Sequence, residues 1–426
     1  MASEIRNFLK NTSVKSDTFW LFLSRIVSAF GTSIFMAIIA NIFGASQVGI
    51  LTWIRNIGSI LGIIGTVSAY ANATFFYDTM TNRDAMGSSL LNASAILSVI
   101  IFLIWLPLYY QLRDILDCNS YSIYFVIGII IVTYFYFLML NSILVSLQKF
   151  KHLSAVNILI TFALILGCSI FYLFDIVFAY VMILFWASYA LGVALQLTHL
   201  IGGRSEYIFK YVIVLDTAYL KRLFKFLSAA SLGEALYMIM FKMDVIVLSM
   251  YVSLAEVGIY GVGVLLSETL MYLPQTVKTV LLPRLGAGNI LPTSKRFMSY
   301  YFFTVSVTFC GALFMSLVGH FVVYHFFGID FISAYDVMVV LLFGIVARSG
   351  KAIIDSVLLT TKNIRFFNWC AIVSMLAFAL LIIFLIPKYK LIGAALACTI
   401  SYCIASFISH LYFFMKILPT MRDSLH

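Results

Sequence analysis

The sequence predicts an all-α membrane protein of about twelve transmembrane helices, arranged as two six-helix lobes. The 426 residues are 63% hydrophobic and 10% charged, and their mean hydropathy is +1.06. Apolar stretches of the roughly 20 residues that a spanning helix needs recur along the whole chain. A four-residue pattern also recurs at half the chain length, which predicts two related halves.

Hydropathy assigns the twelve helices in order along the chain. The expected spans are Thr18–Ile39, Ile50–Phe75, Ser88–Tyr110, Tyr121–Leu147, Leu153–Phe174, Ile176–Leu200, Leu223–Tyr251, Val257–Leu282, Ser299–Phe327, Tyr335–Thr360, Phe366–Ile386 and Leu391–Leu418. The connections between these spans are too short to hold a soluble domain.

The basic residues predict the orientation of the chain, because Lys and Arg in short connections stay on the cytoplasmic side. With the N-terminus inside, the inner segments hold eighteen Lys and Arg residues, and the outer segments hold three, Arg113, Lys388 and Lys390. We therefore expect both termini in the cytoplasm. On this interpretation the net charge of +10 reflects orientation rather than binding to nucleic acid.

The internal repeat predicts how the two halves are related. Gln47–Ile50 reads Q-V-G-I, and Glu256–Ile259 reads E-V-G-I, 209 residues later. Each copy falls between the first and second expected helices of its half. Because six helices separate the copies, the halves should be related by a pseudo-two-fold axis along the membrane normal. The predicted parts are an N-terminal lobe over 1–200, a cytoplasmic linker over 201–222 and a C-terminal lobe over 223–426.

Ten charged residues remain inside the expected helices. Facing lipid, they would cost on the order of 30 kcal/mol together, more than a typical folding stability. They must therefore pair, line a cavity or extend to an interface. The cations are Arg25, Arg55, Lys242, Lys278, Arg348 and Lys351, and the acids are Glu234, Asp244, Glu268 and Asp355.

The cations point to a site for an anionic ligand. Arg25 and Arg55 lie on the first two helices, with no buried acid in that lobe, and Arg grips phosphate oxygens in pairs. Lys351 can pair with Asp355 four residues later, which leaves Arg348 free. The alternative is that Arg25 and Arg55 extend to opposite interfaces and anchor their helices. The expected substrate contacts are Arg25, Arg55, Arg348, Lys242, Lys278 and Lys351.

The acids point to ion coupling, because a buried carboxylate can exchange a proton or a sodium ion between states. Asp244 follows Lys242 by two positions, so the two side chains point to different sides of the helix and are not expected to pair directly. A structural salt bridge is the alternative role for each acid. The expected coupling residues are Glu234, Asp244, Glu268 and Asp355.

Other residues inside the helices add candidates of different kinds. Pro274 removes a backbone hydrogen bond within its helix, so it can serve as a gating hinge or as a static kink. Polar uncharged side chains can hydrogen-bond either sugar hydroxyls or neighbouring helices, among them Asn56, Asn141 and Gln196. The six cysteines form no C-x-x-C pair, and we interpret them as apolar packing residues rather than metal ligands.

The stretch Phe241–Leu285 carries a family resemblance. It holds Lys242 two residues before Asp244, then V-G-I-Y after a short turn, Pro274 within the next helix and Pro283 at its exit. This pattern resembles the polysaccharide exporter family of Wzx-type O-antigen and capsule flippases. The wider relatives of that family are the multidrug and toxic compound extruders (MATE transporters) and the lipid II flippases.

Two further segments strengthen the resemblance. Asn41–Ile50 is similar to the first outer turn of the family, and Ile386–Ala397 is similar to its last. The chain departs from the family at Lys390, where a glycine is common. The likeness covers most of the chain. Together the motifs are specific for the family, and they say little about which glycan is carried.

The resemblance implies a MATE-like fold and a function. It implies a flippase that moves an undecaprenyl-pyrophosphate-linked oligosaccharide, as in O-antigen, lipopolysaccharide or capsule synthesis, across the bacterial inner membrane by alternating access. Coupling to protons or sodium ions is expected, with a glycan polymerase and a chain-length regulator as partners and no cofactor. Family members also place cations on their first two helices, which implies substrate contact for Arg25 and Arg55.

Other functions fit the sequence less well. A multidrug antiporter of the same fold would favour an acidic cleft for organic cations, whereas here six bases face four acids. A membrane-embedded glycan polymerase or glycosyltransferase would need a sizeable outer loop or an acidic metal-binding motif, so we do not expect an enzyme. A channel or purely structural role is harder to exclude from the sequence.

Overall fold

The computed structural model describes most of the chain. The described residues are 14–78, 83–112, 121–146, 149–173, 177–201, 217, 232–286, 295–360 and 363–419. Apart from short turns between helices, the secondary structure in these ranges is helical, and no strand occurs in them.

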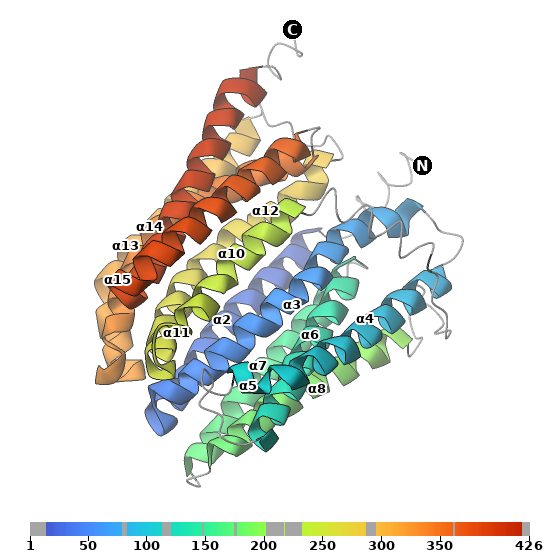
Figure 1. The fold of residues 1–426 in the computed structure, drawn as a ribbon. Helices are drawn as coiled ribbons and strands as arrows, with labels where there is room; N and C mark the ends of the chain where they lie inside the picture. The colour runs from blue at the N-terminus through green and yellow to red at the C-terminus, as the bar shows by residue number, and fades with distance from the viewer. Residues whose placement is uncertain are drawn as a thin grey trace.

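The first half of the chain supplies the helices α2 to α8 (Figure 1). A left-handed residue, Gly44 with φ of 86°, makes the turn between the first two of them, a conformation that glycine adopts without strain. Their bounds are α2 Val14–Phe43, α3 Ala45–Asp78, α4 Arg83–Trp105, η1 Leu106–Leu108, α5 Tyr109–Leu112, α6 Tyr121–Ser146, α7 Phe150–Leu173 and α8 Phe178–Ile201.

The second half supplies α10 to α15. Ser253 caps the start of α11 by accepting a hydrogen bond from the backbone N–H of Glu256, whose side chain bonds back to the cap residue. The bounds are α10 Leu232–Leu248, α11 Leu254–Glu268, η2 Thr269–Met271, α12 Tyr272–Gly286, α13 Lys295–Val322, η3 Val323–Phe327, η4 Ile329–Phe331, α14 Ser333–Thr360, α15 Ile364–Tyr412 and η5 Phe413–Ile417.

The long element α15 is two helices joined by a sharp turn. Lys390 has φ 48° and ψ −120°, which breaks the helix three residues after Pro387. Figure 1 shows the chain running down one arm of α15 and back up the other. The two arms correspond to the predicted helices Phe366–Ile386 and Leu391–Leu418.

The described helices account for the twelve predicted ones. The segments α11, η2 and α12 form one passage, and α13 with η3 forms another. Nine of the described helices are long and apolar enough to cross a membrane, with α15 counted once. The two arms of α15, together with α3 and α10, complete the predicted set. The chain is therefore a multi-pass membrane protein.

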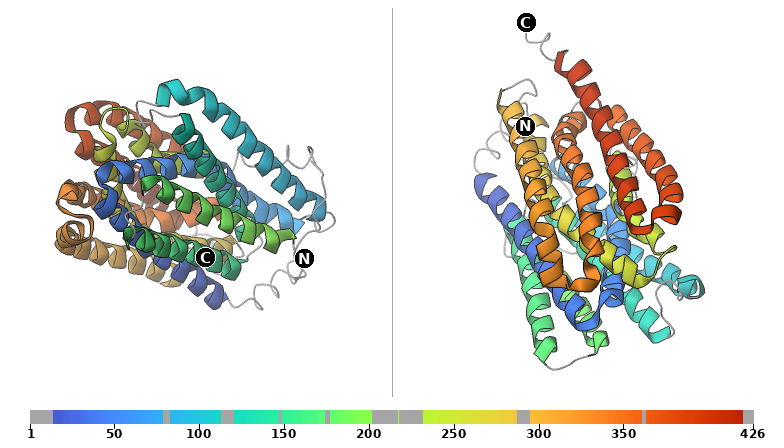
Figure 2. Two further views of the ribbon diagram at one scale, coloured as in Figure 1. Left: turned by 90° about the horizontal axis from the view of Figure 1, so that it is seen from below. Right: turned by 90° about the vertical axis from the view of Figure 1, so that its left-hand side faces the viewer.

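The helices pack as two groups that lie side by side (Figures 1 and 2). In the first group, α2 packs on α7 and α3 on α6, while α8 covers α6 and α7. In the second group, α14 contacts α11, α12, α13 and α15. We call these the N-terminal and C-terminal groups. The exact boundaries of the lobes and linker stay a prediction, since most of 201–222 lies outside the described residues.

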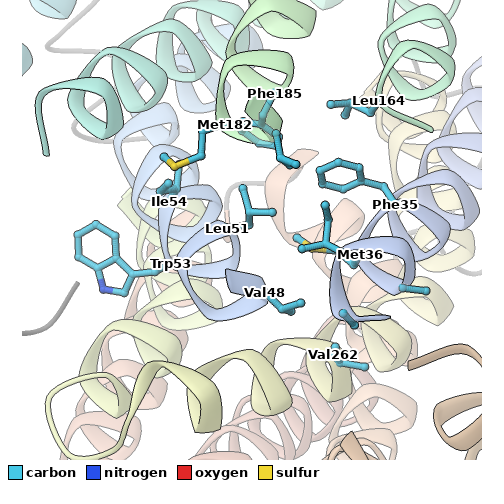
Figure 3. Close-up of a cluster of buried hydrophobic side chains, with 14 of the residues drawn as sticks. Phe35, Met36, Val48, Leu51, Trp53, Ile54, Leu164, Met182, Phe185 and Val262 are labelled. Carbon is cyan, nitrogen blue, oxygen red and sulfur yellow. The ribbon is translucent and has the colours of Figure 1, made fainter. Parts of the chain in front are cut away.

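The two groups meet mainly along α3, which packs on both α10 and α11, and along α2, which packs on α12 and η3. The contact is apolar over much of its length. Figure 3 shows Val262 of α11 beside Met36 of α2 and Val48 of α3, within a core that continues to Phe185 of α8. The two halves thus share one buried core, and a second buried core lies within the C-terminal group.

The two ends of the bundle differ. One end carries the turns at Gly44, Val252 and Gly328, and we call it the hairpin end (lower left in Figure 1). The other end, where α2 begins and η5 ends, we call the terminal end. Inter-group hydrogen bonds gather at the hairpin end. There Trp53 Nε1 donates to Ser249 Oγ at 3.2 Å, and Asn41 Nδ2 donates to the Phe326 carbonyl at 2.6 Å.

Candidate functional site

A narrow pocket, partly open at the surface, lies between the two helix groups, and about 470 Å³ of empty space, open space at its mouth included, surrounds its lining. Helices α2 and α3 of the N-terminal group form one wall, and α10 and α11 of the C-terminal group form the other. The charged residues in its lining are Arg55, Lys242 and Glu268. The uncharged lining residues are Met36, Val48, Thr52, Asn56, Ser59, Gly261, Val262, Val264 and Leu265.

The polar wall of the pocket comes from one face of α3. Thr52, Arg55, Asn56 and Ser59 are spaced by three and four residues, which places them along a single stripe of a helix. Gly49 of α3 packs directly against the backbone of α11 at the hairpin end. Arg55 lies six residues, or about 9 Å, beyond Gly49 along this helix. The stripe therefore starts at the inter-group contact of the hairpin end and runs into the interior.

Arg55 is the cation with the fewest partners in this pocket. Within the described residues it makes no hydrogen bond or ion pair. Its charge acts on Lys242 across the pocket and on Tyr189 of α8. An exposed Arg would be hydrated, but a half-buried one between two helix groups is free to bind an anion.

Asn56 is the second lining residue with unused hydrogen-bonding capacity. Its side chain is 8% exposed, and its Nδ2 donates to the Thr52 carbonyl at 2.8 Å. The Oδ1 atom is buried and has no hydrogen-bond partner among the described residues. A buried acceptor that stays unpaired costs free energy, so a ligand donor at this point would be favoured.

Lys242 and Glu268 form an ion pair within the pocket. Lys242 Nζ lies 2.9 Å from Glu268 Oε1 and 3.0 Å from Oε2, so one ammonium bonds both carboxylate oxygens. Both side chains are about one quarter exposed, at 25% and 24%. Lys242 therefore pairs with Glu268 and not with Asp244, as expected for residues two positions apart. The three charges of the lining leave the pocket positive overall.

Arg25 lies next to the pocket without lining it. Its Nη1 donates to Thr276 Oγ1 of α12 at 3.1 Å, which joins the N-terminal group to the C-terminal group. Tyr272, at the start of α12, is within electrostatic reach of Arg25 and of all three pocket charges. The sequence did not single out Tyr272 or Thr276, since an uncharged side chain in an apolar helix gives no signal of its own.

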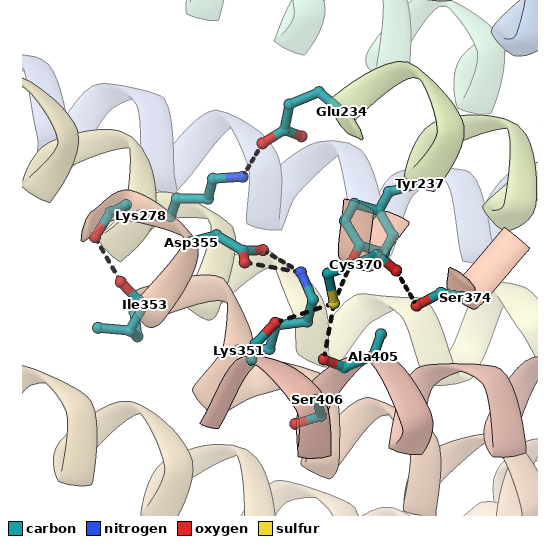
Figure 4. Close-up of polar contacts among 12 residues, drawn as sticks. Glu234, Tyr237, Lys278, Lys351, Ile353, Asp355, Cys370, Ser374, Ala405 and Ser406 are labelled. Carbon is teal, nitrogen blue, oxygen red and sulfur yellow. Dashed lines mark hydrogen bonds and ion pairs between the residues drawn. The ribbon is translucent and has the colours of Figure 1, made fainter. Parts of the chain in front are cut away.

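A second charge cluster lies within the C-terminal group (Figure 4). Lys278 of α12 forms an ion pair with Glu234 of α10. Lys351 Nζ lies 2.7 Å from both carboxylate oxygens of Asp355, four residues later on α14, so the predicted i, i+4 pair is confirmed. Lys351 Nζ also lies 3.9 Å from the centroid of the Tyr237 ring.

Arg348 belongs to the second cluster rather than to the pocket lining. Its guanidinium carbon lies 3.5 Å from the Phe241 ring centroid and 5.1 Å from that of Tyr402, an arrangement that stabilises a cation. Its Nη1 is buried without a hydrogen-bond partner among the described residues. The structure thus brings Arg55, Lys242 and Glu268 together and leaves Arg25 and Arg348 outside their pocket.

Asp244 differs from the other three acids because it bonds only to neutral groups. It is 2% exposed. Its Oδ2 accepts a hydrogen bond from Tyr260 at 2.6 Å and a weaker one from Cys398 at 3.5 Å, and its Oδ1 accepts from the Val245 N–H. The partner residues come from α11 and α15, so this carboxylate is enclosed by three helices of the C-terminal group.

Pro274 lies just beyond a break in a transmembrane passage. The α-helix ends at Glu268, a 3-10 segment occupies Thr269–Met271, and α12 begins at Tyr272. Glu268 is therefore the last α-helical residue before this break. A role of Pro274 as a gating hinge stays a prediction.

Some candidates pair with neighbouring helices, and the described residues offer no metal site. Gln196 Nε2 donates to Asn141 Oδ1 at 2.6 Å, which joins α8 to α6.

No group of three or more His, Cys, Asp or Glu residues with metal-binding geometry occurs in the described part of the chain.

Comparisons with known proteins identify the fold. No protein-family model and no curated protein sequence matches the chain. A solved structure of "Lipid II flippase MurJ, inward closed conformation" is 16% identical with a TM-score of 0.70, and the match covers 93% of this chain and 87% of that one. A "MATE multidrug transporter DinF-BH in complex with R6G" is 13% identical with a TM-score of 0.71, over 95% of both chains.

A third solved structure agrees with these two. It is an outward-facing multidrug resistance MATE family transporter of the MOP superfamily, 14% identical with a TM-score of 0.61, and the match covers 96% of this chain and 97% of that one. The predicted all-α, twelve-helix, MATE-like fold is therefore confirmed.

Proposed function

We propose that this protein is a flippase that moves an undecaprenyl-pyrophosphate-linked oligosaccharide, such as an O-antigen or capsule repeat unit, across the bacterial inner membrane by alternating access. The observation that carries the proposal is Arg55. This unpaired cation faces Lys242 in a pocket that both helix groups build. A site between two groups can open to either side of the membrane when the groups rock.

The chemistry of the pocket suits a pyrophosphate joined to sugars. The pyrophosphate is the part of such a lipid that hydrocarbon accepts least, because its charges lose their hydration there. Arg55 can bond two phosphate oxygens at once, and the pocket keeps an excess of positive charge. Thr52, Asn56 and Ser59 supply hydroxyl and amide groups beside it for sugar hydroxyls. The polyprenyl tail would remain in the lipid.

The packing of the two groups supports alternating access. Counting basic residues predicts that the hairpin end lies on the outer side of the membrane, and at this end the groups touch through backbone contacts and hydrogen bonds. The structure would then be closed to the outside. Release of the ligand would require Trp53 to part from Ser249 and Asn41 to part from the Phe326 carbonyl.

Among the four buried acids, we propose Asp244 as the main ion-coupling residue. Glu234, Glu268 and Asp355 each bond a lysine ammonium, which favours a carboxylate that stays ionised. Asp244 is enclosed by neutral donors and so gains most from binding a proton or a sodium ion. Its distance along the chain from Lys242, only two residues, would let its charge state affect the pocket.

The wider setting follows from the same proposal. The protein would lie in the bacterial inner membrane with both termini in the cytoplasm, and it would supply a glycan polymerase and chain-length regulator with flipped repeat units. Two solved structures with a similar fold are named as a lipid II flippase and a MATE multidrug transporter, which supports a transport function for this chain.

The test is complementation of a strain that lacks the gene. We expect Arg55→Ala and Arg25→Ala to abolish or strongly reduce surface glycan, with the lipid-linked precursor trapped on the cytoplasmic face. Arg55→Lys should retain partial function. Arg365→Ala, an exposed residue near the start of α15, is the matched control and should behave like the wild type.

The opposite outcome points to a different substrate. Normal surface glycan in the deletion strain, combined with altered drug tolerance, would contradict the proposal and favour a multidrug antiporter. Glu268 is the acid in the pocket that an organic cation would then use.

A further inference from the structure

Glu268 forms an ion pair with Lys242, one of the two cations in the pocket lining. Its carboxylate bonds Lys242 Nζ through both oxygens, while Arg55, on the opposite wall, keeps its guanidinium unpaired. Glu268 and Lys242 both belong to the C-terminal group, whereas Arg55 belongs to the N-terminal group. The ion pair therefore lies entirely on one side of the interface that must open.

Removing the Glu268 charge would leave two like charges in a half-buried pocket. Arg55 and Lys242 repel each other across it, and a low-dielectric setting makes such repulsion larger than in water. Their joint attraction for a phosphate would rise for the same reason. Glu268 thus holds the place of an anion on Lys242 while no ligand is bound.

We propose that Glu268 is a built-in counter-anion, which a phosphate group displaces from Lys242 so that the phosphate binds Lys242 and Arg55 together. The inference rests on the proposed function and adds a selectivity rule to it. A ligand carboxylate carries the same single charge as Glu268 and gains little by replacing it. A pyrophosphate carries more charge and more acceptor oxygens, so it competes successfully.

Asn56 independently indicates what lies beside this anion. Its buried Oδ1 lacks a donor, and an ionised phosphate has no hydrogen to donate. A hydroxyl or an N–H of a ligand close to the phosphate would satisfy Asn56. A sugar attached through the pyrophosphate supplies such a donor, whereas a bare prenyl pyrophosphate does not. The expected ligand class is a glycosyl pyrophosphate.

Displacement also explains how the unloaded protein can change state. When the ligand has left, Glu268 neutralises Lys242 again, and the two groups can close over one net charge instead of two. The predicted consequence is that Glu268→Gln binds ligand more tightly and yet transports more slowly, because both ligand release and the return of the unloaded form become harder.

The experiment measures binding of two probes to the purified full chain in nanodiscs at low salt. One probe is a short-chain prenyl pyrophosphate that carries a single N-acetylhexosamine, and the other is the same prenyl pyrophosphate without sugar. Relative to the wild type, Glu268→Gln should bind both probes about tenfold tighter, because a competing charge is removed from a site where close charge pairs couple strongly. Asn56→Leu should weaken binding of the sugar-bearing probe alone.

Two further variants protect the test against misfolding and against a general charge effect. Lys242→Gln should weaken binding, because Glu268 then stands unpaired beside the anion, and adding Glu268→Gln to it should restore part of the loss. Glu256→Gln breaks the exposed pair with Lys390 outside the pocket, so probe binding should stay at the wild-type level. Thermal unfolding of each variant checks that the fold is retained.

The outcomes separate the two proposals. If binding depends on Arg55 but Glu268→Gln binds no tighter than the wild type, the counter-anion is overturned and the proposed function stands. If the wild type and Arg55→Gln bind the sugar-bearing probe equally, the proposed function itself is wrong. Tighter binding by Glu268→Gln with loss in Arg55→Gln supports both.

Discussion

Gly49 of α3 and Gly258 of α11 each lie against the backbone of the other's helix, across the interface of the two groups. A Cβ on Gly49 would fall 1.9 Å from the Leu254 carbonyl oxygen, and a Cβ on Gly258 would fall 2.1 Å from the Ala45 carbonyl oxygen. Gly258 is the counterpart of Gly49, and Leu254 is the counterpart of Ala45, because each pair is separated by 209 residues, the offset of the repeated motif. The contact is therefore reciprocal, as at a two-fold dimer interface.

The first prediction concerns closure of the hairpin end. Gly258→Val should prevent α3 and α11 from closing, because rigid backbone leaves no room for a Cβ. Transport should fall severely, and Thr52→Cys, placed in a cysteine-free background, should become reactive toward an impermeant maleimide from the outer side. Gly311→Ala is the control, since its Cβ would meet only a flexible Leu270 methyl at 2.9 Å.

The second prediction concerns the buried pair of α14. Asp355→Asn leaves the Lys351 ammonium, which is 3% exposed, without a counter-charge. The free energy of unfolding should fall by about 3–5 kcal/mol. The double variant Lys351→Met with Asp355→Leu should recover most of this loss, and thermal unfolding in detergent measures both. A stability of Asp355→Asn equal to that of the wild type would contradict the burial of this pair.

The third prediction concerns Asp244. Asp244→Asn keeps an oxygen for the Tyr260 hydroxyl but cannot change its charge, so transport in vesicles should lose its dependence on the proton or sodium gradient while the protein stays folded. Glu234→Gln, at an acid already paired with Lys278, should keep the gradient dependence. Wild-type transport that ignores both gradients would remove the basis for coupling.

The fourth prediction concerns the turn of α15. Lys390 has φ of 48°, a conformation that costs a residue with a Cβ about 1–2 kcal/mol. Its ion pair with Glu256 is exposed and worth about 1 kcal/mol at most. Lys390→Gly should therefore unfold at a higher temperature than Lys390→Ala, which loses the same pair and keeps the strained backbone. Equal melting temperatures would show that the turn is not strained.

Local features of this chain were predictable from the sequence, and tertiary ones were not. The Lys351–Asp355 pair follows from a spacing of four residues within one helix, which fixes their proximity. Lys242–Glu268 joins residues 26 positions apart and Lys278–Glu234 joins residues 44 apart, so both depend on helix packing that hydropathy does not determine.

The repeated V-G-I motif and Lys390 also show that the sequence does not reveal tertiary contacts or backbone conformation. The two V-G-I motifs predicted that the halves are related, but only the packed helices show that Gly49 and Gly258 touch. The resemblance singled out Lys390 as a position where glycine is common. The positive φ at this residue supplies the physical reason, which the sequence of one chain cannot reveal.

Two ion pairs join α10 to helices that follow it in the chain, and this has a consequence for insertion of the protein into the membrane. Helix α10 carries Glu234, Lys242 and Asp244 within 17 residues, and each such charge penalises insertion of an isolated helix by about 2.5–3.5 kcal/mol. Its counter-charges Glu268 and Lys278 are synthesised later, on α11 and α12. Helix α10 should therefore leave the translocon for the lipid only together with the passage formed by α11 and α12. The unit of insertion is then a helical hairpin rather than a single helix.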